Sequence, residues 1–124
     1  MDQKNLKILI VDDEKEVVEI LGDMIKVDGH NVIVTYDGQK ALETYQKEKF
    51  DMVFADISMP GMDGIDLTKK LLELNKKAKV VIITGHTGSL EVELALNAGA
   101  KKFLEKPFTK KDIDQTIKDI LKID

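Results

Sequence analysis

Short apolar runs alternate with segments of helical periodicity five times along the 124-residue chain. The apolar runs cover residues 6–11, 31–35, 52–55, 79–83 and 102–105. Continuous apolar strands alternating with helices are typical of a parallel sheet that helices cover on both faces. Right-handed crossovers then bring the carboxyl ends of all strands to one edge of the sheet. The pattern predicts an α/β fold: a doubly wound, five-stranded parallel sheet in the order 2-1-3-4-5, with five helices.

The five helices are expected after the five strands, and each has its own signals. The first covers residues 15–27, the second begins at Asp37-Gly38, and the fourth covers residues 89–98 and ends at Gly99. Asp63 and Thr109 are expected to cap the third and fifth helices. The second helix carries Ala41, Leu42 and Tyr45. The residues expected to face the core are Val17, Leu21 and Met24; Leu67, Leu71 and Leu74; and Ile113, Ile117, Ile120 and Leu121.

Composition limits the classes of protein that remain. With 43% apolar residues, the chain suits one globular domain over residues 1–124. It has no cysteine, which excludes disulfides and thiolate chemistry, and its polar N-terminus and short apolar runs predict a cytoplasmic protein without signal peptide or membrane span. A net charge of -4 argues against a nucleic-acid surface of its own. All 19 basic residues are lysines, so phosphate recognition cannot use an arginine fork.

Polar side chains stand where the apolar runs end. They are Asp12 and Asp13 after the first run, Asp56 after the third, Thr84 after the fourth and Lys106 after the fifth. Because parallel strands end at one edge, and because strands one and three are neighbours in the predicted order, the three aspartates should share one crevice. The threonine and the lysine should flank it. Topology alone thus predicts a site from residues that are distant in the sequence.

Such a crevice suits phosphoryl transfer. Three clustered carboxylates raise one another's proton affinity unless a cation joins them. Mg²⁺ is favoured, because a few carboxylates, waters and a phosphoryl oxygen complete its octahedron. Lys106 would add a positive charge, and Thr84 a hydroxyl that donates to a phosphoryl oxygen. An aspartate carboxylate can then act as the acceptor of an in-line transfer and form an acyl phosphate.

Each of these residues also has a plainer interpretation. A single aspartate after a strand most often caps the following helix or loop, and only the five residues together favour a site. For Lys106-Pro107, either the proline ends the loop before the last helix, or a cis peptide bond aims the lysine inward.

Four motifs in combination resemble a known family. They are Ile-Val-Asp-Asp-Glu at 10–14, Asp56 followed by Met-Pro-Gly-Met-Asp-Gly at 59–64, Thr84-Gly85, and Gly99-Ala100 leading to Phe-Leu-Glu-Lys-Pro-Phe at 103–108. Over about residues 6–121 the chain resembles the receiver domain of bacterial two-component response regulators, the CheY type. The resemblance implies that Asp56 accepts a phosphoryl group from a histidine kinase, and that the chain is a phosphoacceptor and not an enzyme acting on other substrates.

The resemblance also implies a metal site and a switch. Asp13 would bind Mg²⁺ directly and Asp12 through water, with Asp56 and the backbone carbonyl of Ser58 as further ligands. Thr84 would hydrogen-bond the phosphoryl group and Lys106 would pair with its oxygens. Phe103 matches the aromatic residue that swings inward when the threonine moves toward the phosphate, which repacks the face formed by the fourth helix, fifth strand and fifth helix. A core or edge-strand aromatic is the plainer interpretation of Phe103.

Two positions near the site are expected to tune the lifetime of the phosphoryl group. Ser58 and His86 lie two residues beyond Asp56 and Thr84, where the family sets the rate of hydrolysis, although a solvated loop histidine is an equal interpretation of His86. His30 begins the second strand, away from the crevice, and is expected to be structural.

The resemblance implies a sensor histidine kinase as partner, docking on the first helix and the loop after the fifth strand. Val18, Ile20 and Ile25 widen the apolar stripe of that helix, which fits either a docking surface or a broadly buried helix. A histidine phosphotransfer protein or a downstream target would be a further partner, with no direct nucleic-acid or membrane contact. The chain begins at Met1 and ends without a linker, which favours a stand-alone regulator.

Other functions fit the residues less well. A nucleotide or flavin binder needs a glycine-rich turn where this chain has Asp12-Asp13-Glu14. A haloacid-dehalogenase-like phosphatase carries its nucleophile in an Asp-x-Asp motif after the first strand, which is absent here. The complete five-residue set argues against an adaptor that has lost phosphorylation. A relay intermediate or a phosphate sink stays open as an alternative output, and so does a metal-dependent aspartyl-nucleophile phosphatase.

Overall fold

Five parallel strands form the single sheet of the computed structural model, which describes residues 5–85 and 90–122. The strands are β1 (Lys7–Val11), β2 (Asn31–Thr35), β3 (Met52–Asp56), β4 (Val80–Thr84) and β5 (Lys102–Glu105). Their order is β2-β1-β3-β4-β5, and every neighbouring pair is parallel. The predicted fold class and strand order are therefore confirmed, and β5 lies at an edge as its polar sequence indicates.

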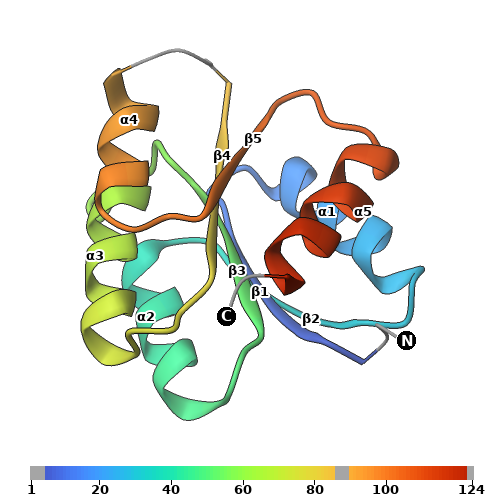
Figure 1. Cartoon of the computed structure of the whole chain (residues 1–124), viewed down its shortest axis with the longest axis horizontal. Coiled ribbons are helices and arrows are strands. Elements are labelled where there is room, and N and C mark those ends of the chain that lie inside the picture. The colour runs from blue at the N-terminus through green and yellow to red at the C-terminus, as the bar shows by residue number, and fades with distance from the viewer. Residues whose placement is uncertain (1–4, 86–89, 123–124) are drawn as a thin grey trace.

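Helices cover both faces of this sheet. They are α1 (Lys15–Lys26), α2 (Gly38–Lys47), α3 (Gly64–Leu74), α4 (Leu90–Asn97) and α5 (Lys110–Leu121). Figure 1 shows α2, α3 and α4 on one side of the sheet and α1 and α5 on the other. Alternate strand residues face the two sides, so the core has two layers. Leu9, Val53 and Ile82 belong to the layer under α2 and α3, while Ile10, Phe54 and Ile83 belong to the layer under α1 and α5.

The predicted caps at Asp63, Thr109 and Gly99 are confirmed, and Asp37, the expected start of the second helix, caps α2. The side chains of Asp37 and Asp63 accept hydrogen bonds from backbone N–H groups three residues on, at 2.7 and 2.9 Å. Thr109 forms a reciprocal capping box with Asp112 at the start of α5. Gly99 ends α4 with φ of 118°, a conformation that favours glycine, and its N–H donates to the carbonyl of Leu96 at 3.0 Å.

The predicted buried face of α1 is wrong by one residue. Val18, Leu21 and Ile25 are fully buried, whereas Val17 and Met24 are only half-buried. The buried stripe packs with Ile113 and Ile117 of α5 in the same core layer. Apolar residues occupy two adjacent stripes of α1 at the same helical spacing, so periodicity alone could not select the one that faces the sheet.

The structure distinguishes the two interpretations of the wider apolar stripe on α1. Val18 and Ile25 are core residues, as a broadly buried helix requires, while Ile20 is 53% exposed. Leu74 was expected to be buried but is 47% exposed, because it is the last residue of α3 and borders an open hollow lined by Tyr45 and Phe50. Within the described residues, no helix combines the length and the apolar character that crossing a membrane requires.

Candidate functional site

The carboxyl ends of β1 and β3 bring three aspartates together, as predicted. Val11 is paired with Ala55 in the parallel register of these two strands, so Asp12 and Asp56 are the next residues of neighbouring strands. Carboxylate oxygens of Asp12, Asp13 and Asp56 all lie within 4.8 Å of one another. This is the point at which the strand order reverses, where a doubly wound sheet opens a crevice at its edge.

Asp12 is a buried carboxylate in which one oxygen accepts no hydrogen bond from the described residues. Its side chain is fully buried, and Oδ1 accepts a hydrogen bond from the N–H of Glu14 at 2.9 Å. Oδ2 accepts no hydrogen bond from any described residue, although Nζ of Lys106 lies 3.4 Å away. Burial raises the pKa of Asp12, and the hydrogen bond from Glu14 opposes this only in part. A buried carboxylate oxygen without a donor is suited to a cation.

Asp56 is also buried, with 5% of its surface exposed. Burial, followed by the negative charge of Asp12, raises the pKa of Asp56 to about 6, and the positive charge of Lys106 opposes the rise. The side chain thus loses its proton less readily than a solvated aspartate does. A cation in the crevice would reverse this effect, because it would favour the ionised form.

Lys106 reaches into the crevice from the end of β5. Its Nζ lies 2.9 Å from Oε1 of Glu14 and 3.4 Å from a carboxylate oxygen of both Asp12 and Asp56. Burial lowers the pKa of Lys106, but the hydrogen bond to Glu14 and the charges of Asp56 and Asp12 outweigh it, so the net pKa is raised. The Lys106–Pro107 peptide bond is cis, which was one of the two interpretations of that dipeptide.

Of the other predicted residues, Thr84 and Ser58 line the same crevice. Thr84 is buried at the end of β4, where its carbonyl accepts from the N–H of Lys106 at 2.8 Å, and Ser58 is exposed in the loop after β3. Phe103 lies on β5 with 38% of its surface exposed. His86 lies outside the described residues. His30 lies at the opposite end of the sheet and accepts a hydrogen bond from the N–H of Leu6 at 3.3 Å, which agrees with a structural role.

The crevice itself has a volume of about 350 Å³. It is lined by Asp13, Glu14, Asp56, Ile57, Ser58, Thr84, Gly85, Glu91 and Lys106. Glu14 and Glu91 were not predicted to take part. Glu14 directly follows the aspartate pair, so its position in the sequence was an available signal, whereas the place of Glu91 depends on how α4 packs and has no local signal.

The comparison with protein families decides what kind of domain this is. Residues 8–118 match the family described as "Response regulator receiver domain". The chain belongs to this family. Receiver domains are the response regulator part of two-component signalling, so the chain is a receiver domain of such a system.

Two transcriptional regulatory proteins that the receiver domain matches are about twice its length. The chain is 32% identical over 118 residues to the alkaline phosphatase synthesis transcriptional regulatory protein PhoP of Bacillus subtilis (strain 168), covering 95% of the chain and 49% of the relative. It is 35% identical over 116 residues to the transcriptional regulatory protein CpxR of Escherichia coli (strain K12), covering 94% and 49%. The receiver domain thus spans about half the length of these relatives.

Solved receiver structures share its fold. Chemotaxis protein CheY4 of Vibrio cholerae superposes with a TM-score of 0.89 at 26% identity, covering 94% of this chain and 98% of that one. CheY in the CheX-CheY-BeF3-Mg complex of Borrelia burgdorferi superposes with a TM-score of 0.89 at 32% identity, covering 95% and 90%.

Proposed function

We propose that this receiver domain accepts a phosphoryl group from a histidine kinase on Asp56. The observation that supports the proposal is the contact set of that carboxylate: Asp12 and Asp13 lie within 4.8 Å, and Nζ of Lys106 lies 3.4 Å from Oδ1. The buried position holds the acceptor rigidly at the strand end and keeps bulk water from most of its surface. The resemblance to CheY in a complex with BeF3 and Mg supports the same role.

The acidic cluster fits Mg²⁺. Asp12, Asp13 and Asp56 supply hard oxygen ligands, with the carbonyl of Ser58 as a further candidate, and Oδ2 of Asp12 has no donor among the described residues. When bound, Mg²⁺ would neutralise charge on the carboxylates and on the phosphoryl oxygens. The chain needs this help because it has no arginine with which to hold a phosphate.

In the transfer, a carboxylate oxygen of Asp56 forms a bond to phosphorus while the bond from phosphorus to the donor nitrogen breaks. The electron pair of that bond stays on the histidine ring of the donor, which takes up a proton. Lys106, whose Nζ lies 3.4 Å from Asp56, would pair with the phosphoryl oxygens, and Thr84, which lines the crevice, would donate its hydroxyl to one of them. Preorganised charges of this kind stabilise the transition state without having to move far. The same crevice would admit the water that later removes the phosphoryl group, with Ser58 and His86 tuning that step.

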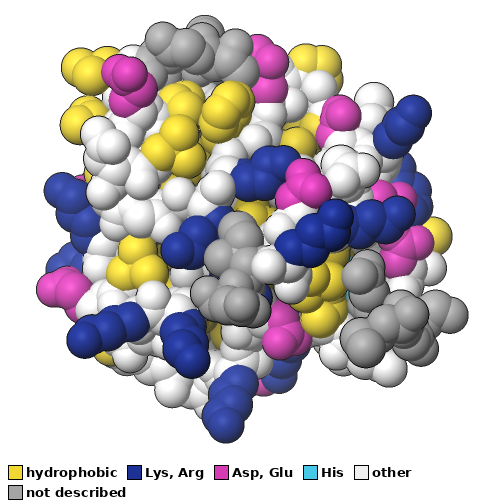
Figure 2. All heavy atoms as spheres, viewed as in Figure 1, with side chains coloured by type: hydrophobic (Ala, Val, Ile, Leu, Met, Phe, Trp, Pro, Cys, Tyr) yellow, Lys and Arg dark blue, Asp and Glu magenta, His cyan; other side chains and the backbone are white. Residues whose placement is uncertain are grey.

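The response is proposed to be a change at the α4–β5–α5 face. Figure 2 shows hydrophobic side chains gathered over α4, and Leu90, Leu94 and Phe103 are 68%, 45% and 38% exposed. Movement of Thr84 toward a phosphoryl group would leave room for Phe103 to turn inward. Partner binding at this face would then depend on the phosphorylation state, because the modification biases an existing equilibrium between two conformations.

The kinase is proposed to dock at the outer side of α1 and the loop after β5. Ile20 is 53% exposed there, with Val17 and Met24 half-buried beside it. We propose that the chain acts in the cytoplasm, where such a kinase obtains its phosphoryl group. A phosphotransfer protein or a downstream target would be the next partner, and we propose that residues 1–124 act as one phosphoaccepting domain with no activity on other substrates.

Intact-mass measurement tests the proposal. The chain is incubated with Mg²⁺ and acetyl phosphate and should gain one phosphoryl adduct. Asp56→Asn should abolish the adduct, while Asp66→Asn, a matched change at an exposed aspartate on α3, should retain it. An adduct that persists in Asp56→Asn would overturn the assignment. Steady release of phosphate without an adduct would instead favour the phosphatase alternative.

A further inference from the structure

Two glutamates stand at the mouth of the crevice without a part in the proposed chemistry. Glu14 precedes α1, and its side chain is 62% exposed. Glu91 lies in the first turn of α4 and is exposed. Both line the same crevice as Asp56 and Thr84. Neither is one of the three clustered carboxylates that fit Mg²⁺. We refer to Glu14 and Glu91 as the acidic rim.

The acidic rim leaves the crevice negative even after the carboxylates are neutralised. Three clustered aspartates and two rim glutamates face Lys106, the one cation among the described residues that line the crevice. A divalent ion together with Lys106 balances three negative charges. Two negative charges then remain, which is as many as the acidic rim contributes. A metal site for an anionic substrate does not need these two extra negative charges. The extra charges oppose the approach of any free anion.

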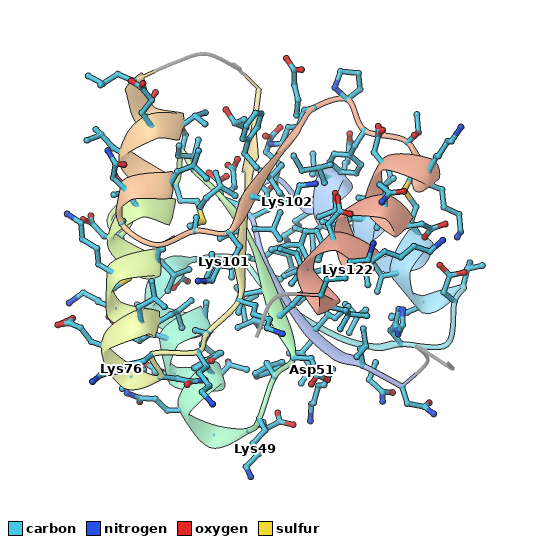
Figure 3. The ribbon with its side chains drawn as sticks, in the orientation of Figure 1. Lys49, Asp51, Lys76, Lys101, Lys102 and Lys122 are labelled. Atoms are coloured by element: carbon cyan, nitrogen blue, oxygen red, sulfur yellow. The ribbon has the colours of Figure 1, made fainter. Side chains whose placement is uncertain are left out.

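Several lysines lie away from the acidic rim, and Nζ of Lys15, which follows Glu14, lies 5.7 Å from the centre of the Tyr36 ring. Figure 3 shows Lys49 and Lys76 at the lower end of the molecule, the same end as Asp51, which precedes β3. Lys101 precedes β5 and so lies at the amino end of that strand, away from Lys106 at its carboxyl end. Salt screens exposed charges beyond about 8 Å at physiological ionic strength. The field at the mouth is therefore set by nearby groups.

We propose that the acidic rim selects the phosphodonor: it disfavours small, highly charged donors in solution and favours a phosphohistidine carried on a positively charged protein surface. The selection rests on the proposed function, because it acts on entry to the same acceptor. A positively charged donor surface gains from Glu14 and Glu91 during the encounter, whereas a free anion has to approach against them. The acidic rim thus separates signalling by a kinase from phosphorylation by small metabolites.

The effect is measured as a ratio between two donors of different charge. Acetyl phosphate is a dianion near neutral pH, and phosphoramidate is a monoanion. A carboxylate some 7 Å from the reacting phosphorus should slow the more charged donor by about twofold relative to the other, and two carboxylates by about fourfold, at low ionic strength. The ratio of the second-order rate constants for phosphorylation of Asp56 by the two donors cancels changes that affect the chemical step equally.

Three variants and one control make the test. Glu14→Gln, Glu91→Gln and the double variant are compared with the wild-type chain, and Glu43→Gln/Glu73→Gln removes the same charge from exposed positions on α2 and α3. The double variant should raise the acetyl phosphate to phosphoramidate ratio about fourfold, and added salt should reduce the gain. Glu91→Gln alone should give about half of the effect on a logarithmic scale. The ion pairs of Lys106 are with Asp12, Glu14 and Asp56. The Glu91→Gln variant therefore tests the electrostatic effect of the charge without breaking an ion pair of the lysine.

The outcomes divide cleanly. An unchanged ratio in the double variant overturns the acidic rim, and so does an equal rise in the control. If Glu91 only favours the positive N-terminal end of α4, its substitution should alter stability and leave the ratio unchanged. If the wild-type chain gains no adduct from either donor, the proposed function itself fails and the selection fails with it.

Discussion

Asp56 is a residue whose ionised form is opposed by its surroundings. It is 5% exposed and lies beside Asp12, which is fully buried and also has a raised pKa. Lys106, 3.4 Å from both carboxylates, offsets part of the cost. The acceptor therefore stays in place at the expense of stability, in line with the general finding that functional carboxylates lie in environments that shift their pKa.

Without Mg²⁺, we expect Asp56→Asn to stabilise the chain at high pH. The pKa of Asp56 is about 6 in the folded chain, against an ordinary value of 3.8. Between these pH values the folded chain keeps a proton that the unfolded chain has lost, so the free energy of unfolding falls as pH rises through this window. The full cost applies above it, and the difference corresponds to about 3 kcal/mol.

Urea unfolding in EDTA at about pH 8 and again near pH 4 is the measurement for Asp56→Asn. The variant should be more stable than the wild type by about 2–3 kcal/mol at the higher pH. Most of this gain should be lost at the lower pH, where Asp56 keeps its proton in the folded chain and only about half of the unfolded chains have lost it. Asp66→Asn, at an exposed position, serves as control and should show little change. A gain that does not depend on pH would contradict the assigned cause.

Gly64 allows the close backbone packing that positions Asp56. A Cβ at Gly64 would lie 2.5 Å from the carbonyl oxygen of Asp56 and 2.9 Å from Cα of Ile57, and both are backbone atoms that cannot turn aside. We expect Gly64→Ala to lower the free energy of unfolding by about 1–3 kcal/mol and to slow phosphorylation of Asp56. Gly22→Ala is the control, because its Cβ would meet only side chains at 3.8 and 3.9 Å. Urea unfolding and intact mass measure the two effects, and equal stability of both variants would contradict this account.

At the scale of the element, α1 separates burial from docking within one helix. Val18 is fully buried and Ile20 is 53% exposed, two residues apart. We expect Val18→Asp to cost at least about 3 kcal/mol of unfolding free energy, because it places a charge in the core. Ile20→Asp should change stability by less than about 0.5 kcal/mol and slow phosphotransfer from the cognate kinase. Thermal unfolding with phosphotransfer assays separates the two, and full phosphotransfer to Ile20→Asp would contradict docking at this side of α1.

The helices show which features could be predicted from the sequence and which could not. Asp63 and Thr109 cap their helices through hydrogen bonds to groups three residues away, so their signals are local and the predicted caps were confirmed. Val17 and Val18 are adjacent residues of the same type, and the packing of α1 against the sheet and α5 decides which of them is buried. Local chemistry was therefore predictable, whereas the choice between two equally spaced stripes was not.

At the scale of the whole molecule, the candidate site is a product of strand order. Asp12 and Asp56 are 44 residues apart in the sequence, and the pairing of β1 with β3 makes them neighbours. Strand ends identified in the sequence, combined with the handedness of crossovers, were sufficient to predict this convergence. The position of Glu91 was not predictable in this way, because it depends on where the start of α4 lies relative to the crevice.

The last prediction concerns the coupling of Mg²⁺ to global stability. An ion that binds only the folded chain should raise the free energy of unfolding by about 1.4 kcal/mol for each tenfold increase in concentration above its Kd. Asp13→Asn should abolish most of this increase. Because Asp13 is exposed, the substitution should cost little stability in EDTA, which separates loss of the ion from damage to the fold. Thermal unfolding across a Mg²⁺ series, against NaCl of equal ionic strength, measures the effect. The NaCl series accounts for screening of the net charge of -4. An equal rise of Tm in wild type and Asp13→Asn would mean that Mg²⁺ stabilises the chain at another place, and the three-aspartate site would then have to be abandoned.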